Sequence, residues 1–208
     1  MKGNYDNVAP FYDLLARFIF GNAILQANLV LVNAVQANSS ILIVGGGTGY
    51  ILEEISKKHD SGLQITYVEV SKKMMSLSKK RNTGNNKVLL INESIADISF
   101  LQQYDVVITP FFFDNFTDNT AKTIFIKLHD VLTSNGLWLF ADFQLSKNNN
   151  IWKRWMLDLM YFFFRVFCNI ETSHLPDTKL LFEANNYQSV FMKSFYKDFI
   201  YAVIYKKQ

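Results

Sequence analysis

The chain is poor in features that mark several common classes of protein. Its 208 residues include a single cysteine, Cys168, which excludes an internal disulfide and a zinc site built from several cysteines. One cysteine fits the reducing cytosol, and the polar N-terminus with its acids differs from a secretion signal. The sequence therefore predicts a cytoplasmic protein.

Concentrated charge and metal-binding patterns are also scarce. The net charge is only +3, and the lysines are scattered between acids, which argues against nucleic acid as a partner. No pair of histidines or group of carboxylates has the spacing of a metal site, so we expect no catalytic metal.

Long apolar runs are missing as well. The most hydrophobic segment, 152–170, carries charges, and its uninterrupted apolar run covers only residues 159–164, whereas a transmembrane helix needs about 20 apolar residues. An amphipathic helix that covers a pocket is the favoured interpretation, and a helix on a membrane surface is the alternative. We expect no stable insertion into a membrane and peripheral contact at most.

Apolar and aromatic residues are abundant. Half of the residues are apolar, 19 are phenylalanine and 10 are tyrosine, more aromatics than a plain α/β scaffold requires. The clusters PFFFDNF and MYFFF suggest a pocket walled by aromatic side chains, while core packing is an equal alternative. No linker or repeat divides the chain, so we expect one domain, 1–208, with a helical cap at 1–37 and a helical insertion or lid at 146–175.

The stretch ILIVGGGTG, residues 41–49, is the most informative part of the chain. An apolar strand breaks into a glycine cluster and continues into a helical pattern. Glycines at such a turn let a ligand and the next helix approach the backbone, and free N–H groups at the helix start attract an anionic group. Tyr50 stands where a dinucleotide fingerprint GxGxxG needs its last glycine, so the spacing is GxGxG.

A second strand, residues 64–69, ends in Glu69, about 20 residues beyond the glycines, where a sugar-binding acid is expected. A carboxylate there accepts hydrogen bonds from two ribose hydroxyls. A tight turn explains the glycines alone, and an ordinary surface acid explains Glu69 alone. Neither explains why a strand, the glycines, a helix, a second strand and an acid follow one another in this order.

Alternating strands and helices predict an α/β fold with a doubly wound parallel sheet, whose ligand lies outside the carboxyl ends of the strands. Two final runs, 187–196 and 199–207, are joined only by Lys197 and Asp198, which predicts an antiparallel hairpin. The other expected elements are helices at 10–35 with a break at Gly21, after Gly49, at 71–81 with Ser71 as cap and at 119–132, and strands at 41–45, 64–69, 87–92, 104–110 and 137–143.

Together these features resemble the class I S-adenosylmethionine-dependent methyltransferases, in particular the small-molecule enzymes of ubiquinone and menaquinone synthesis. ILIVGGGTG is similar to the first motif of the family, Glu69 to the acid that closes its second strand, and the terminal hairpin to its last two strands. VAPFYDLL, residues 8–15, is similar to its N-terminal helix. The resemblance implies a Rossmann-like, mostly parallel, seven-stranded sheet.

The resemblance also implies that S-adenosylmethionine is the cofactor. Two departures from the family pattern stand out: Ile43 replaces a frequent acid, and Asn92 with Glu93 replaces a frequent Gly-Asp. The residues implied to hold the cofactor are Tyr12, Gly45, Gly46, Gly47, Gly49, Glu69, Val70, Glu93, Ser94 and Ile95.

Methyl transfer from a sulfonium depends mainly on aligning the nucleophile, and a general base helps where the acceptor is a hydroxyl or a carbon acid. Thr109 and Asp114 follow the fourth strand, Asp142 follows the fifth, and His174 lies in a loop; of these we expect Thr109, Asp142 and His174 to be catalytic. The acceptor is expected to be a small apolar or aromatic molecule. The alternatives are an NAD-dependent oxidoreductase, a cofactor-binding module without turnover, and a membrane-surface protein.

Overall fold

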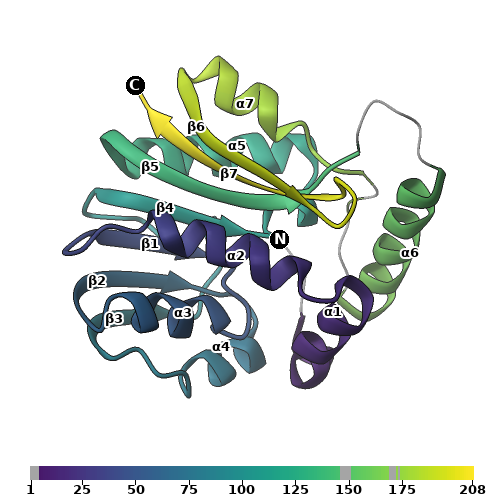
Figure 1. Ribbon diagram of the computed structural model, residues 1–208, viewed down its shortest axis with the longest axis horizontal. Coiled ribbons are helices and arrows are strands. Elements are labelled where there is room, and N and C mark those ends of the chain that lie inside the picture. The colour runs from purple at the N-terminus through teal and green to yellow at the C-terminus, as the bar shows by residue number, and fades with distance from the viewer. Residues whose placement is uncertain (1–4, 146–150, 169–171, 173) are drawn as a thin grey trace.

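A computed structural model describes residues 5–145, 151–168, 172 and 174–208. The chain forms a seven-stranded sheet in the order β3-β2-β1-β4-β5-β7-β6, with helices on both faces (Figure 1). The strands are β1 Ser40–Val44, β2 Ser61–Val68, β3 Asn85–Ile91, β4 Tyr104–Pro110, β5 Leu132–Phe143, β6 Tyr187–Phe195 and β7 Ile200–Lys207.

Helices connect most of these strands. The main helices are α1 Tyr12–Phe20, α2 Ala23–Ala34, α3 Tyr50–Lys58, α4 Lys72–Ser78, α5 Asp118–Val131, α6 Ile151–Cys168 and α7 Thr178–Ala184. Three short 3-10 turns are η1 Tyr5–Asn7, η2 Ala9–Phe11 and η3 Phe113–Asn115.

The strand pairing confirms the predicted fold class. Strands β1 to β5 pair in parallel, whereas β7 runs antiparallel to both β5 and β6. The break between the first two helices falls at Gly21, as predicted, where φ is +58°. The Ser71 cap of α4 is also confirmed, since its hydroxyl accepts a hydrogen bond from the Met74 N–H at 3.2 Å.

The core lies on both faces of the sheet. Side chains alternate along β1, so Ile41 and Ile43 pack with α2 and α3 on one face, while Leu42 and Val44 pack on the other face, in the cluster that includes α5 and α7 residues. All four are buried, as expected for a central parallel strand covered on both sides.

Several predicted boundaries need correction. Strand β5 begins at Leu132, directly after α5, so Asn135 and Gly136 lie inside the strand rather than stopping the helix. Asn135 has a φ of +63°, and the register between β4 and β5 shifts at this place, which accommodates the extra residues. Helix α7 was not predicted; the carboxylate of Asp177 caps it by accepting from the Leu180 N–H.

The terminal hairpin has a longer turn than predicted. Strand β6 ends at Phe195 and β7 starts at Ile200, so four residues, not two, connect the strands. Tyr196, Lys197 and Asp198 all have positive φ values, which places three successive residues in the left-handed region.

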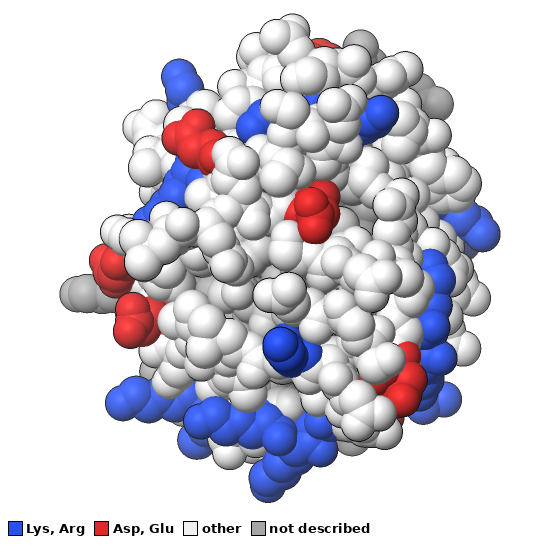
Figure 2. Space-filling model, turned by 90° about the vertical axis from the view of Figure 1, so that its left-hand side faces the viewer, with Lys and Arg blue, Asp and Glu red and all other residues white. Residues whose placement is uncertain are grey.

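Two further properties concern membrane spans and surface charge. In the part of the chain that the structure describes, no single helix is long and apolar enough to cross a bilayer, although Ala9–Phe20 and Ala23–Ala34, bent by 102°, pass as a pair by length and composition alone. Figure 2 shows the face opposite α1 and α6, where acids and cations are scattered over an uncharged surface and the cations gather along the lower edge.

Candidate active site

A cavity of about 880 Å³ lies at the carboxyl ends of β1, β2 and β4. The glycine loop after β1 and the end of β2 form one part of its wall, and helices α1, α2 and α6 form another. This is the edge of the sheet at which a doubly wound fold binds its ligand.

The four glycines of the loop have different structural roles. A Cβ atom on Gly45 would lie 2.4 Å from the Phe112 ring, and one on Gly46 would lie 2.3 Å from the Tyr67 ring. Gly47 has a φ of +61° and a Cβ there would meet nothing within 4 Å. Gly45 and Gly46 therefore permit close packing, while Gly47 faces the open space of the cavity.

Gly49 does not line the cavity, although the resemblance implied a place in the cofactor site. It has a φ of +79°, and a Cβ atom there would lie 2.6 Å from the Cβ of Ser78. Its role is to let the glycine loop and the start of α3 pack against the end of α4.

Glu69 holds the glycine loop to the end of β2. Its carboxylate accepts hydrogen bonds from the N–H groups of Gly47 at 3.1 Å and of Ser71 at 2.8 Å. The hydroxyl of Tyr67 donates to the Gly47 carbonyl at 2.8 Å, which fixes the loop from its other side. The loop conformation is thus set by side chains on β2 and directly after it.

Burial changes the acidity of Glu69. The side chain is almost fully buried, and this raises the pKa of its carboxyl to about 7, although three backbone N–H groups oppose the rise. Close to neutral pH the carboxyl therefore carries a proton for part of the time.

The other residues assigned to the cofactor line the same cavity. They are Tyr12, Val70, Glu93, Ser94 and Ile95. Asn92, one of the departures from the family pattern, donates its amide to the carbonyls of Glu69 at 2.7 Å and Val70 at 3.1 Å. The asparagine thereby ties the end of β3 to the segment after β2.

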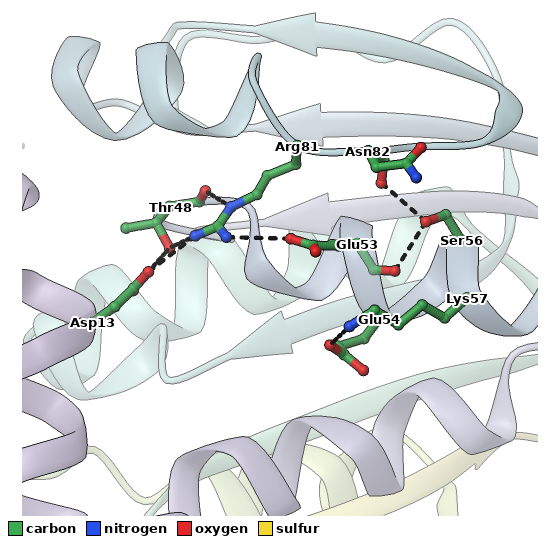
Figure 3. A network of polar contacts seen from close by, with 8 residues as sticks. All are labelled: Asp13, Thr48, Glu53, Glu54, Ser56, Lys57, Arg81 and Asn82. Atoms are coloured by element: carbon green, nitrogen blue, oxygen red, sulfur yellow. Dashed lines mark hydrogen bonds and ion pairs between the residues drawn. The ribbon is translucent and has the colours of Figure 1, made fainter.

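A polar network that the sequence did not reveal fastens α1 to the glycine loop (Figure 3). The Thr48 hydroxyl donates to Asp13 at 2.8 Å, and Arg81 donates to Asp13 at 2.9 Å and to the Thr48 carbonyl at 3.0 Å. Arg81 also contacts Glu53 on α3 at 3.2 Å. Asp13 and Thr48 line the cavity, so the network closes one of its sides.

Two buried carboxyl groups meet at the ends of β4 and β5. Asp142 accepts from the N–H groups of Asp114 at 3.2 Å and of Phe143 at 2.8 Å, and Asp114 accepts from the Asn115 amide at 2.7 Å. Asp114 lines the cavity, whereas Asp142 is not part of the cavity wall.

The surroundings of this pair favour a bound proton. Burial raises the pKa of Asp114 well above its usual range, and the neighbouring charge of Asp142 raises it further. Burial raises the pKa of Asp142 to about 7. The pair therefore retains a proton near neutral pH.

The structure places the other two predicted catalytic residues outside the cavity wall. Thr109 is fully buried in the core, where its hydroxyl accepts a hydrogen bond from the Trp138 indole at 2.9 Å. His174 lies on the surface with its Nε2 atom 2.9 Å from the Asp118 carboxylate. Neither side chain is brought together with Asp114.

The wall beyond Asp114 is apolar and mostly aromatic. The predicted clusters divide between pocket and core, since Phe113 is fully buried in the core while its neighbours on both sides face the cavity. The Tyr5 hydroxyl donates to Asn115 at this end. The apolar side chains that line it include Leu15, Ile19, Phe111, Phe112, Phe116, Phe143, Met160, Phe163 and Phe164.

Sequence comparison matches the part of the chain that contains the glycine loop and Glu69. Residues 41–136 match the methyltransferase domain family. A malonyl-[acyl-carrier protein] O-methyltransferase of Priestia megaterium is 33% identical over 143 residues, which are 69% of this chain and 51% of the relative. The ubiquinone/menaquinone biosynthesis C-methyltransferase UbiE of Wigglesworthia glossinidia brevipalpis is 29% identical over 67% of this chain and 58% of its own. The chain thus spans little more than half the length of these curated relatives.

Solved structures share the fold at low sequence identity. The N-methyltransferase NodS of Bradyrhizobium japonicum, in complex with S-adenosylhomocysteine, has a TM-score of 0.64 at 14% identity and covers 88% of this chain and 85% of its own. A 1,6-didemethyltoxoflavin-N1-methyltransferase of Burkholderia thailandensis has a TM-score of 0.66 at 12% identity, over 97% of this chain and 85% of its own.

The family match, the strand order and the open position at Gly47 beside a buried acid agree with one another. Residues 41–136 of the chain match the methyltransferase domain family, and the seven-stranded sheet is the fold of solved methyltransferases that bind S-adenosylhomocysteine.

Proposed function

We propose that this chain transfers the methyl group of S-adenosylmethionine to a small apolar or aromatic acceptor. The observation that carries the proposal is a single cavity with two unlike ends. The glycine loop and Glu69 lie at one end, and Asp114 with the aromatic wall lies at the other.

The residues at the first end suit the cofactor. Gly47 leaves open the space that a side chain would fill. Both Glu69 oxygens accept backbone N–H groups, and the carboxylate retains lone pairs that accept ribose hydroxyls. When bound, S-adenosylmethionine supplies a methyl group that is already electrophilic because the sulfur is positively charged.

The chain itself contributes position and a dry environment. Helices α1 and α6 line the cavity with apolar side chains, which keep water from the reacting atoms and orient an apolar acceptor. The Asp13, Thr48 and Arg81 network holds α1 in this place. Residues 1–37 thus act as a cap, and the helix within 146–175 acts as a lid.

Asp114, in its ionised form, is the proton acceptor in this proposal. It lines the cavity at the acceptor end, and a carboxylate whose pKa is raised is a stronger base than one in water. Asp142 acts through Asp114, as a positioning residue, because it accepts from the Asp114 N–H and does not reach the cavity.

The relatives do not select the methylated atom, since one is an O-methyltransferase and the other a C-methyltransferase. The apolar lining favours a small molecule over a nucleic acid, and the single buried cysteine is consistent with a cytoplasmic location.

Replacing Gly47 tests the cofactor site. Gly47→Val fills the open space, and we expect the affinity for S-adenosylhomocysteine to fall at least about 100-fold by calorimetry. Gly47→Ala places a single methyl group at the same positive φ, with less filling and less strain than valine, so a smaller loss of affinity is expected. Unchanged affinity in the valine variant contradicts the assignment.

The raised pKa of Glu69 predicts a pH dependence. Ribose hydroxyls stabilise the carboxylate, so affinity for S-adenosylhomocysteine is full above pH 7 and falls as the pH drops through the pKa of about 7, by up to about tenfold per unit. Glu69→Gln binds more weakly and flattens the profile between about pH 6 and 8. A wild-type profile that is already flat argues against this role.

Asp114→Asn tests the proton acceptor. Transfer of labelled methyl to the apolar fraction of a cell extract is expected to fall by about 10²- to 10⁴-fold, with the affinity for S-adenosylhomocysteine unchanged. Asp118→Asn is the matched control, because this exposed carboxylate contacts His174 and does not line the cavity. Equal activity of both variants would remove Asp114 from the mechanism.

Ligand-induced stabilisation separates the enzyme classes. S-adenosylhomocysteine at 100 times its Kd is expected to add about 2.7 kcal/mol to the free energy of unfolding, whereas NAD adds none. A rise in Tm with NAD alone would favour the oxidoreductase. Tight binding of S-adenosylhomocysteine without methyl transfer to any fraction of an extract would favour a binding module.

A further inference from the structure

Helix α6 carries an apolar stripe on its outer side as well as on its buried side. The exposed apolar residues recur at helical spacing, and Trp155 and Phe162 are 70% and 68% exposed. The buried side of the helix, which includes Leu157 and Met160, faces the body of the protein. The members of the outer stripe are Ile151, Trp155, Leu159, Phe162 and Val166.

Helix α1 adds a second exposed stripe at the same end of the molecule (Figure 1). Phe11, the N-cap residue at the end of η2, and Leu14 and Phe18 on α1 follow the spacing of one helical face, and Phe18 is 86% exposed. The two helices line the same cavity, and the ring of Tyr5, just before α1, lies 5.5 Å from that of Phe164 on α6. The two stripes lie on neighbouring elements at the same end of the molecule and are together called the α1/α6 face.

Cations dominate the charges beside this face. Arg17 on α1 and Arg154 and Arg165 on α6 are all exposed. Among the acids of these helices, Asp13 is paired with Arg81, which leaves Asp158 as the exposed acid of α6. An apolar aromatic surface with cations at its margin complements a bilayer with anionic headgroups.

We infer that the α1/α6 face docks on the surface of an anionic lipid bilayer. Tryptophan and phenylalanine side chains enter the boundary between headgroups and acyl chains, while the arginines contact the headgroups. A second copy of the chain fits less well, because a twofold contact through this face would bring the arginines of the two copies together. A lipid surface has no such conflict.

The α1/α6 face is continuous with the cavity. Leu159 and Arg17 are exposed and also line the cavity, so its opening reaches this surface. Resting on the proposed function, docking would let an apolar acceptor pass from the bilayer into the cavity without crossing water. Docking itself does not require methyl transfer.

Sedimentation with vesicles tests the inference directly. The whole chain is expected to bind vesicles of phosphatidylcholine mixed with phosphatidylglycerol at least about tenfold better than phosphatidylcholine alone. Phe18→Glu and Phe162→Glu should each lower binding by about tenfold, because they place a charge in the apolar boundary. Phe191→Glu is the matched control, since this exposed phenylalanine lies on β6, and it should bind like the wild type.

The affinity for S-adenosylhomocysteine, measured on the same variants, separates this inference from the proposed function. Unchanged affinity in Phe18→Glu and Phe162→Glu, together with lost vesicle binding, supports docking. Wild-type protein that binds S-adenosylhomocysteine but no vesicles overturns docking alone. An equal loss of vesicle binding in Phe191→Glu also overturns it. So does a wild-type protein that binds no vesicles but forms a dimer, if Phe18→Glu and Phe162→Glu dissociate that dimer.

Discussion

The arrangement depends on one buried carboxyl group. Glu69 accepts backbone N–H groups from the glycine loop and from the start of α4, so a single side chain positions two segments that border the cavity. Those bonds stabilise the carboxylate against a burial that raises its pKa to about 7. In the proposed site, a carboxyl group whose pKa lies so close to neutrality responds to new hydrogen-bond donors such as the two ribose hydroxyls.

The cavity joins this polar end to an apolar one, and the same physical effect operates at both. Removal of water raises the pKa of Glu69 at the cofactor end and of Asp114 and Asp142 at the acceptor end. An environment that excludes water suits a reaction in which a charged sulfur loses its charge and a proton must be taken up. Helices α1 and α6 supply that exclusion, and their outer faces carry the same apolar character to the surface.

Local pattern was enough to predict the sheet and the position of the glycine loop. Strand, glycine turn and helix follow one another within residues 41–49, and an acid ends the next strand, so spacing pointed to Gly47 and Glu69, which line the cavity. The link between Asp13 and Arg81 joins residues 68 positions apart and leaves no local signal. Side chains alternate along β4, so the core position of Thr109 follows from its register opposite Phe140 and its hydrogen bond from the Trp138 indole, neither of which a local pattern shows. Asp114 lines the cavity and Asp142 does not, a difference that spacing does not report.

A crystal structure with S-adenosylhomocysteine tests the central claim most directly. Density for the ligand is expected beside Gly47, with the ribose on the Glu69 carboxyl and the sulfur turned toward Asp114 and the aromatic wall. Density outside this cavity, or a ribose that does not contact Glu69, would contradict the account.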